Sequence, residues 1–160
     1  ASLAAVRSGL QSLRPVGGRL QIHRCADAIG VIDDTYNANP GSVQAALEVL
    51  GQLPGEHWLV LGDMGELGGE SRQLHRDIGA RAAAAGCDRL FTLGGDAASA
   101  TAAFTGPAAH FDDFESLQAE LEAQLHPGVQ VLIKGSRSMC MERVVQALLA
   151  RLQPRPGGRH

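Results

Sequence analysis

The sequence predicts an α/β domain in which a mostly parallel sheet of about six strands lies between two layers of helices. Short apolar runs alternate about five times with segments whose apolar residues recur at helical spacing. Most of the apolar runs end in a turn of glycine and polar residues. Strands that are joined by helices pair in parallel with right-handed crossovers, so these turns should share one edge of the sheet.

The expected strands are short apolar runs bounded by glycine, proline or polar residues. They are residues 20–25, 28–33, 57–62, 89–94, 108–111 and 129–135. The run at 108–111, "AAHF", carries the weakest strand signal.

The expected helices show apolar residues three and four positions apart. They cover residues 42–50, 70–86, 96–104, 112–125 and 141–152. Gly86 is a stop signal for the second of them. Asp112 and Glu115 have the spacing of a capping box at the start of the fourth.

Composition narrows the class of protein and of partner. The chain has 160 residues, 44% hydrophobic, which suits one globular domain with a sizeable core. A net charge of −3, 4% aromatic residues and no basic run argue against nucleic acid. No apolar stretch approaches the roughly 18 residues of a membrane span, so no membrane partner is expected.

The cysteines and histidines predict neither disulfides nor a metal site. Three cysteines lie far apart, which is typical of reduced thiols in a cytoplasmic protein. Six histidines are scattered without ligand spacing, so no bound metal is expected. His75 is interpreted as a structural histidine, and Cys140 as a buried, inert thiol.

The turn "DDTYNANP" at residues 33–40 follows the second expected strand and has two interpretations. Asp and Asn cap helices, and the proline suits a helix start. Alternatively, Asp34 accepts a ribose hydroxyl or a metal-bound water, and Tyr36 stacks or hydrogen-bonds. In that case Asn37 and Asn39 donate to phosphate or carbonyl oxygens. Spacing alone leaves both interpretations open.

The turn "KGSRS" follows the last expected strand and resembles an anion site. Gly135 permits a close backbone approach, and Ser136 or Ser138 has a suitable position to cap the final helix. Lys134 and Arg137 add two cations, and an arginine grips a carboxylate in bidentate fashion. A capped helix with two solvated cations is the alternative.

The turn "GDMGELGGE" places Asp63, Glu66 and Glu70 after the third expected strand. A metal loop is conceivable, but a turn that caps the following helix is favoured. Neither a G-x-x-x-x-G-K-[ST] motif nor a G-x-G-x-x-G motif occurs anywhere in the sequence. A nucleotide site in this chain would therefore be only a partial one.

Three ordered stretches resemble one family. "DDTYNANPGSVQAALEVL" (33–50), "LVLGDMGELG" (59–68) and "VLIKGSRSMCMERVV" (131–145) are similar to the C-terminal domain of the Mur ligase family. The resemblance covers about residues 10 to 150. The first two motifs indicate the branch that joins D-alanyl-D-alanine to UDP-N-acetylmuramoyl-tripeptide. Gly41 stands where this family often has an acidic residue, and we expect that to affect helix capping rather than chemistry.

The resemblance implies a Rossmann-like domain cut from a three-domain ATP-dependent amide ligase. Residues 1–18 would be a remnant of the central ATPase domain with a hinge at Pro15–Gly18, residues 19–153 the C-terminal domain, and residues 154–160 a flexible tail. ATP and Mg2+ would bind mainly to the central domain. The tripeptide carboxylate would become an acyl phosphate that the dipeptide amine attacks, within peptidoglycan precursor synthesis.

The resemblance also assigns residues to two subsites. The nucleotide would contact Arg19, Asp34, Tyr36, Asn37 and Asn39. Our hypothesis for the incoming dipeptide is contact with Lys134, Ser136 and Arg137, with Arg137 on its carboxylate. No residue of this domain is assigned as catalytic. UDP-N-acetylmuramoyl-tripeptide would be held by other domains.

The same resemblance predicts a cytoplasmic monomer whose isolated C-terminal domain folds, binds ATP weakly and does not catalyse. Two other classes of function are the alternatives. One is a stand-alone Rossmann-like binding module without catalysis. The other is a sister ligase that adds a single amino acid or polyglutamate. A dinucleotide oxidoreductase fits least, because the glycine motif is missing.

Overall fold

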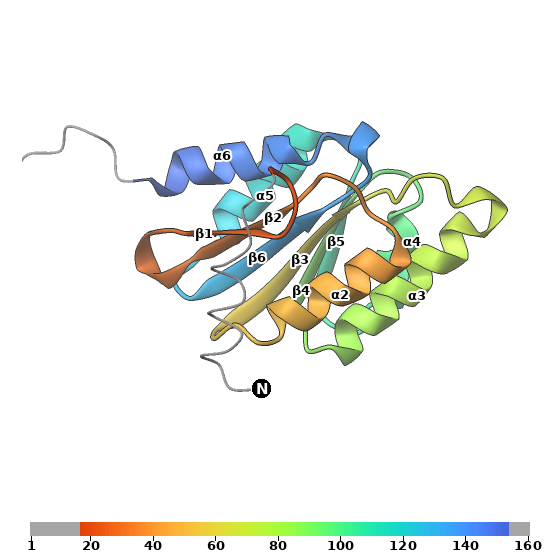
Figure 1. Cartoon of the computed structure of the whole chain (residues 1–160), viewed down its shortest axis with the longest axis horizontal. Helices are drawn as coiled ribbons and strands as arrows, with labels where there is room; N and C mark the ends of the chain where they lie inside the picture. Colours follow the sequence, from red (N-terminus) through yellow and green to blue (C-terminus); the bar gives the residue numbers. More distant parts are fainter. Residues whose placement is uncertain (1–16, 154–160) are drawn as a thin grey trace, which may run out of the picture.

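Six strands form a single sheet in the order β1-β2-β6-β3-β4-β5 (Figure 1). The computed structural model describes residues 17–153, so residues 1–16, which hold most of the proposed remnant and half of the hinge, and the tail at 154–160 lie outside the described residues. The strands are β1 (Gln21–Arg24), β2 (Gly30–Asp34), β3 (Glu56–Gly62), β4 (Arg89–Leu93), β5 (Ala108–Phe111) and β6 (Val129–Lys134).

Parallel pairing dominates the sheet, which confirms the expected fold class. β2, β6, β3, β4 and β5 pair in parallel, and β1 alone runs antiparallel, next to β2. The turn between β1 and β2 contains a 3-10 turn, η1 (Ala26–Ala28). Because of this turn, β2 begins two residues later than the sequence predicted. β1 and β5 form the two edges of the sheet.

Helices cover both faces of the sheet (Figure 1). They are α2 (Pro40–Leu50), α3 (Ser71–Ala84), α4 (Ala98–Ala103), α5 (Phe114–Gln124) and α6 (Glu142–Leu152). The first three lie on one face, and α5 and α6 lie on the other (Figure 1). Within residues 17–153, no helix is both long enough and apolar enough to cross a bilayer.

The core is split into two layers by the alternation of side chains along each strand. Leu59 and Leu61 of β3 belong to the layer beneath α2, α3 and α4. Trp58 and Val60 of the same strand belong to the layer beneath α5 and α6. All four side chains are fully buried. Burial of each such side chain contributes about 1.5–3 kcal/mol. This explains why the strand reads as an unbroken apolar run.

Two expected helix caps are wrong. The cap of α5 is Asp113, not Asp112, because the helix begins at Phe114 and Asp113 Oδ1 accepts the Ser116 N–H at 2.7 Å. Neither Ser136 nor Ser138 caps α6. Ser136 precedes the 3-10 turn η3 (Arg137–Met139) and Ser138 lies within it, whereas the residue that precedes α6 is Met141.

Helices α3 and α4 approach each other closely at Gly79. This glycine is buried, and a Cβ at its position would overlap the carbonyl oxygen of Ala100. The backbone of α4 therefore occupies the space that a side chain at position 79 of α3 would need. The requirement for glycine here is one of packing, not of backbone conformation.

We predict that Gly79→Ala destabilises the domain by about 1–3 kcal/mol, because overpacking outweighs the gain in helix propensity. Gly41→Ala in α2 is the matched control. Gly41 is exposed, and its Cβ would meet only Asn39 Oδ1 at 3.4 Å. Urea denaturation should show a loss of stability for the first variant and no comparable loss for the second. Equal effects would contradict this packing argument.

A charged cluster lies at the amino-terminal end of β3, away from the strand-end turns. Glu56 Oε1 accepts the Trp58 indole N–H at 2.8 Å, and its Oε2 accepts the His126 Nε2–H at 2.7 Å. The other imidazole nitrogen faces the Gln124 carbonyl at 3.0 Å. The Gln124 carbonyl first and the Glu56 carboxylate second raise the pKa of His126. The Trp58 hydrogen bond is the main cause that lowers the pKa of Glu56.

This cluster predicts a stability plateau in mildly acidic solution. A raised His126 pKa adds stability that is present below its ordinary value of 6.5 and is lost as pH rises through the folded-state pKa. A lowered Glu56 pKa adds stability that is present above 4.5 and is lost as pH falls through the folded-state value. The urea concentration at the denaturation midpoint should therefore decrease when the pH is raised above this plateau and when it is lowered below it. His126→Ala should flatten the alkaline side, and an unchanged alkaline slope in that variant would contradict the assignment.

Candidate functional site

The carboxyl ends of β2, β6 and β3 meet at one edge of the sheet. The register pairs Asp34 with Lys134, and Lys134 with Leu61. The helix after β6 covers one face, whereas the helices after β2 and β3 cover the other. In open α/β sheets, ligands bind outside strand ends at such a change of face. The strand-end turns singled out in the sequence therefore do come together.

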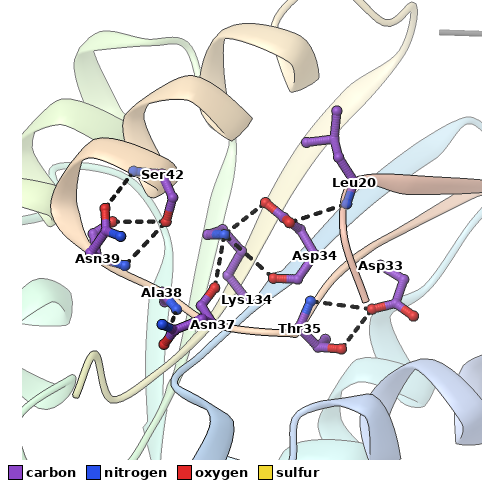
Figure 2. A network of polar contacts seen from close by, with 9 residues as sticks. All are labelled: Leu20, Asp33, Asp34, Thr35, Asn37, Ala38, Asn39, Ser42 and Lys134. Carbon is purple, nitrogen blue, oxygen red and sulfur yellow. Dashed lines mark hydrogen bonds and ion pairs between the residues drawn. The ribbon is translucent and has the colours of Figure 1, made fainter. Parts of the chain in front are cut away.

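The buried ammonium group of Lys134 ties two of these turns to each other (Figure 2). Its Nζ lies 2.7 Å from Asp34 Oδ2, 3.2 Å from the Asn37 carbonyl and 3.4 Å from the Asp34 carbonyl. The Lys134 side chain is 1% exposed and that of Asp34 is 15% exposed. An ammonium has three donors, and these three acceptors account for them. The structure thus joins two residues that the sequence assigned to different subsites.

The second carboxylate oxygen of Asp34 holds the segment that enters β1. Asp34 Oδ1 accepts the Leu20 N–H at 3.1 Å (Figure 2). The Tyr36 N–H donates to the Gly18 carbonyl at 2.8 Å. Leu20 has a left-handed backbone with φ of 45°, which is unfavourable for a leucine and needs such support. These two hydrogen bonds flank Arg19 and fix the backbone that carries it.

The two asparagines make local hydrogen bonds. Asn37 Oδ1 accepts the Ala38 N–H at 2.9 Å. Asn39 Oδ1 accepts the Ser42 N–H at 2.8 Å, in a reciprocal capping box at the start of α2. The capping interpretation of this turn is therefore confirmed for Asn39. Both asparagine residues remain exposed, so this bonding does not remove them from a ligand-facing surface.

Three exposed side chains from distant parts of the chain gather beside this network. The Arg19 guanidinium lies 4.3 Å from the centre of the Tyr36 ring, and the Arg137 guanidinium lies 4.9 Å from it. Tyr36 is 40% exposed, the highest exposure of any large hydrophobic side chain in residues 17–153. Ser136, by contrast, is buried, and its Oγ lies 3.1 Å from Ser138 Oγ. Of the residues assigned to the dipeptide, only Arg137 reaches the surface.

Glycines allow the ends of β3 and β6 to pack closely. A Cβ on Gly135 would collide with the side chain of Met141 and lie 3.3 Å from Gly62 Cα. A Cβ on Gly62 would also meet Met141. Gly135 thus allows close packing within the protein, whereas the approach of an anion to this glycine stays a prediction. Met141 closes the buried layer directly under the strand ends.

Asp63 organises this edge of the sheet through hydrogen bonds to two other turns. Its Oδ1 accepts the Ala97 N–H at 2.7 Å, and its carbonyl accepts the Ser136 N–H at 2.8 Å. It therefore links the turns after β3, β4 and β6. The expectation that this acidic turn caps α3 is wrong, because Glu70 precedes α3 without a side-chain cap. Asp63 instead binds the N–H just before α4.

His75 is structural, as expected. It is fully buried in α3, its Nε2 accepts the Met64 N–H at 2.9 Å, and its Nδ1–H donates to the Ser71 carbonyl at 2.7 Å. The sequence did not predict a buried, hydrogen-bonded pair formed by Asp33 and Thr35. Thr35 donates its hydroxyl to Asp33 Oδ1 at 2.6 Å (Figure 2). The Asp-x-Thr spacing of a side-chain turn was the available signal.

The described thiols are unpaired and differ in environment. Burial raises the pKa of Cys87 to about 12, and burial also raises the pKa of Cys25. The expectation of a buried thiol at Cys140 is wrong, because this residue sits in a left-handed turn on the surface. In residues 17–153, no three histidine, cysteine or acidic side chains are grouped so that they could hold a metal ion.

Comparison with known proteins gives a consistent answer. Residues 18–137 match the family model described as "Mur ligase, glutamate ligase domain". The chain is 42% identical over 150 residues to the UDP-N-acetylmuramoyl-tripeptide–D-alanyl-D-alanine ligase of Escherichia coli K12. That alignment covers 92% of this chain and 33% of the relative. The ligase of the same name from Bacillus subtilis is 32% identical over 153 residues, or 88% of this chain and 32% of the relative.

Solved structures of MurF ligases are also similar to this chain. The MurF ligase of Thermotoga maritima in complex with ADP superposes with a TM-score of 0.77 and 29% identity, over 95% of this chain and 37% of that one. MurF from Acinetobacter baumannii gives a TM-score of 0.78 and 33% identity, over 94% of this chain and 34% of that one. The chain spans about a third of the length of the curated relatives that it matches. Because the family model matches three quarters of its length, this chain belongs to the Mur ligase family.

Proposed function

We propose that this chain is the C-terminal domain of an ATP-dependent ligase that joins D-alanyl-D-alanine to UDP-N-acetylmuramoyl-tripeptide. The observation that carries the proposal is 42% identity along 92% of this chain to an E. coli ligase with that name. The ADP complex of the Thermotoga maritima ligase supports ATP as the energy source. The exposed cations at the strand ends supply complementary charge for anionic substrates.

In the proposed reaction, ATP phosphorylates the terminal carboxylate of the tripeptide. The amine of D-alanyl-D-alanine attacks the resulting acyl phosphate, and inorganic phosphate leaves as the amide bond forms. An acyl phosphate is hydrolysed by water, so the site must be closed before it forms. The sequence contains no P-loop, so the main phosphate cradle and the Mg2+ that the reaction uses would belong to another domain.

On the nucleotide side, this domain would contribute five residues. They are Arg19, Asp34, Tyr36, Asn37 and Asn39. The exposed Arg19 guanidinium is suited to phosphate. Each carboxylate oxygen of Asp34 already accepts one hydrogen bond and has capacity for a second, so a ribose hydroxyl can still donate to it.

On the dipeptide side, Arg137 is the residue proposed to bind the carboxylate. It is the exposed cation of the assigned set, and its guanidinium matches a carboxylate in bidentate fashion. Ser136 and Lys134 are buried, so we propose that they support this turn from beneath. Lys134 would act through Asp34 and the Asn37 carbonyl rather than by touching the dipeptide.

The proposed site is half of a larger one, so the isolated chain should fold, bind ATP weakly and remain inactive. Gly18 has a φ of 75° next to Tyr36, and we propose that the domain closes by rotation about this entry segment. A monomeric state and a cytoplasmic location stay predictions. A binding module without catalysis is the competing function, and the assay below separates the two.

The deciding assay measures ATP-dependent phosphate release by the intact ligase with UDP-N-acetylmuramoyl-tripeptide and D-alanyl-D-alanine. We expect Arg137→Ala to raise the KM for the dipeptide about ten- to hundredfold, because it removes a charged hydrogen-bonding partner. Arg143→Ala removes an equal charge from an exposed residue six positions further along the chain, and should leave the KM unchanged.

Each result has a separate meaning. Wild-type activity with an unaffected Arg137→Ala variant would keep the ligase and discard the role of Arg137. No activity in a folded, intact protein with any amine substrate would contradict the proposed function and favour the binding module.

A stability measurement on this chain tests the supporting role of Lys134. Lys134→Met should cost about 3–5 kcal/mol, since it leaves the partly buried Asp34 carboxylate without its counter-charge. Adding Asp34→Asn should recover part of that loss. Urea denaturation of the single and double variants is the measurement. A single variant as stable as wild type would show that the ion pair does not hold the two turns together.

A further inference from the structure

Two arginines from opposite ends of the described chain share one aromatic ring. The Arg19 guanidinium lies 4.3 Å and the Arg137 guanidinium 4.9 Å from the centre of the Tyr36 ring. Within residues 17–153, neither guanidinium has a carboxylate within ion-pair distance. Two uncompensated positive charges are therefore held near each other at the ligand-facing edge of the sheet.

Like charges repel, so their proximity needs an attractive contact. The face of an aromatic ring is negative and attracts each guanidinium. The backbone that carries the Tyr36 ring is held in place by hydrogen bonds. The Tyr36 N–H is bonded to the Gly18 carbonyl, and the carbonyl of the next residue, Asn37, accepts from the buried Lys134 ammonium. The backbone on both sides of the ring is therefore anchored, whereas the two arginine side chains are exposed.

We propose that Tyr36 is a positioning residue for both subsites, holding Arg19 toward the nucleotide and Arg137 toward the dipeptide. This inference rests on the proposed function, which assigns one arginine to each substrate. Its new content is that the two subsites depend on the same ring. The contact uses the ring face and not the hydroxyl group, so phenylalanine should replace tyrosine, and a branched aliphatic residue should not.

The test compares Tyr36→Leu and Tyr36→Phe in the intact ligase, with KM measured separately for ATP and for D-alanyl-D-alanine. Tyr36→Leu should raise both KM values about two- to fivefold, the size of one exposed cation–π contact, with kcat nearly unchanged. Tyr36→Phe keeps the ring face and should raise both KM values less than Tyr36→Leu does. Phe114→Leu is the matched control, because it removes a ring 4.7 Å from the Arg143 guanidinium, outside the proposed site. It should alter neither KM.

Several outcomes would overturn the inference. They are a rise in only one KM, a Tyr36→Phe variant as impaired as Tyr36→Leu, or an equal effect of Phe114→Leu. An inactive wild type would contradict the proposed function instead, and NMR of this 160-residue chain then decides. Side-chain protons of Arg19 and Arg137 should show upfield ring-current shifts that Tyr36→Phe keeps and Tyr36→Leu abolishes. The absence of these shifts at either arginine in the wild type would overturn the positioning role.

Discussion

The ammonium group of Lys134 imposes the constraint on which this edge of the sheet depends. A buried charge is costly unless it is paired and fully hydrogen-bonded. Its partners are the Asp34 carboxylate and two backbone carbonyls, which are available only if β2, β6 and the turn after β2 are all in register. Through the other oxygen of Asp34, the same requirement extends to the segment around Leu20. The polar turn after β2 therefore stabilises the fold and is also a candidate ligand surface.

The fold could be predicted because its signals are local. Strands buried on both faces, such as β3 and β6, read as apolar runs whatever their neighbours are. Boundaries were less predictable. The cap of α5 moved by one residue because Asp112 and Asp113 are chemically equivalent caps, and only the geometry of the preceding loop selects between them. The exposure of Cys140 likewise follows from a turn conformation that no periodicity encodes.

The candidate site was predicted as a set of residues but not as a set of contacts. Asp34 and Lys134 are 100 positions apart, and nothing in their spacing indicates that one neutralises the other. The same limit explains why the contacts of Asp63 were not predicted, since its partners lie on two other turns. Motif reasoning identifies side chains of suitable chemistry. It does not determine which of them face a ligand and which, like Ser136, support the backbone from below.

The two edges of the sheet also bear on how the molecule meets others in solution. β1 and β5 have four residues each, so an extended segment from another chain would find only a short row of free backbone groups to pair with. The long strands, β3 and β6, lie in the interior, where both neighbours already satisfy their hydrogen bonds. This layout keeps the apolar strands β3 and β6 away from the edges of the sheet, where they could pair with a strand of another chain.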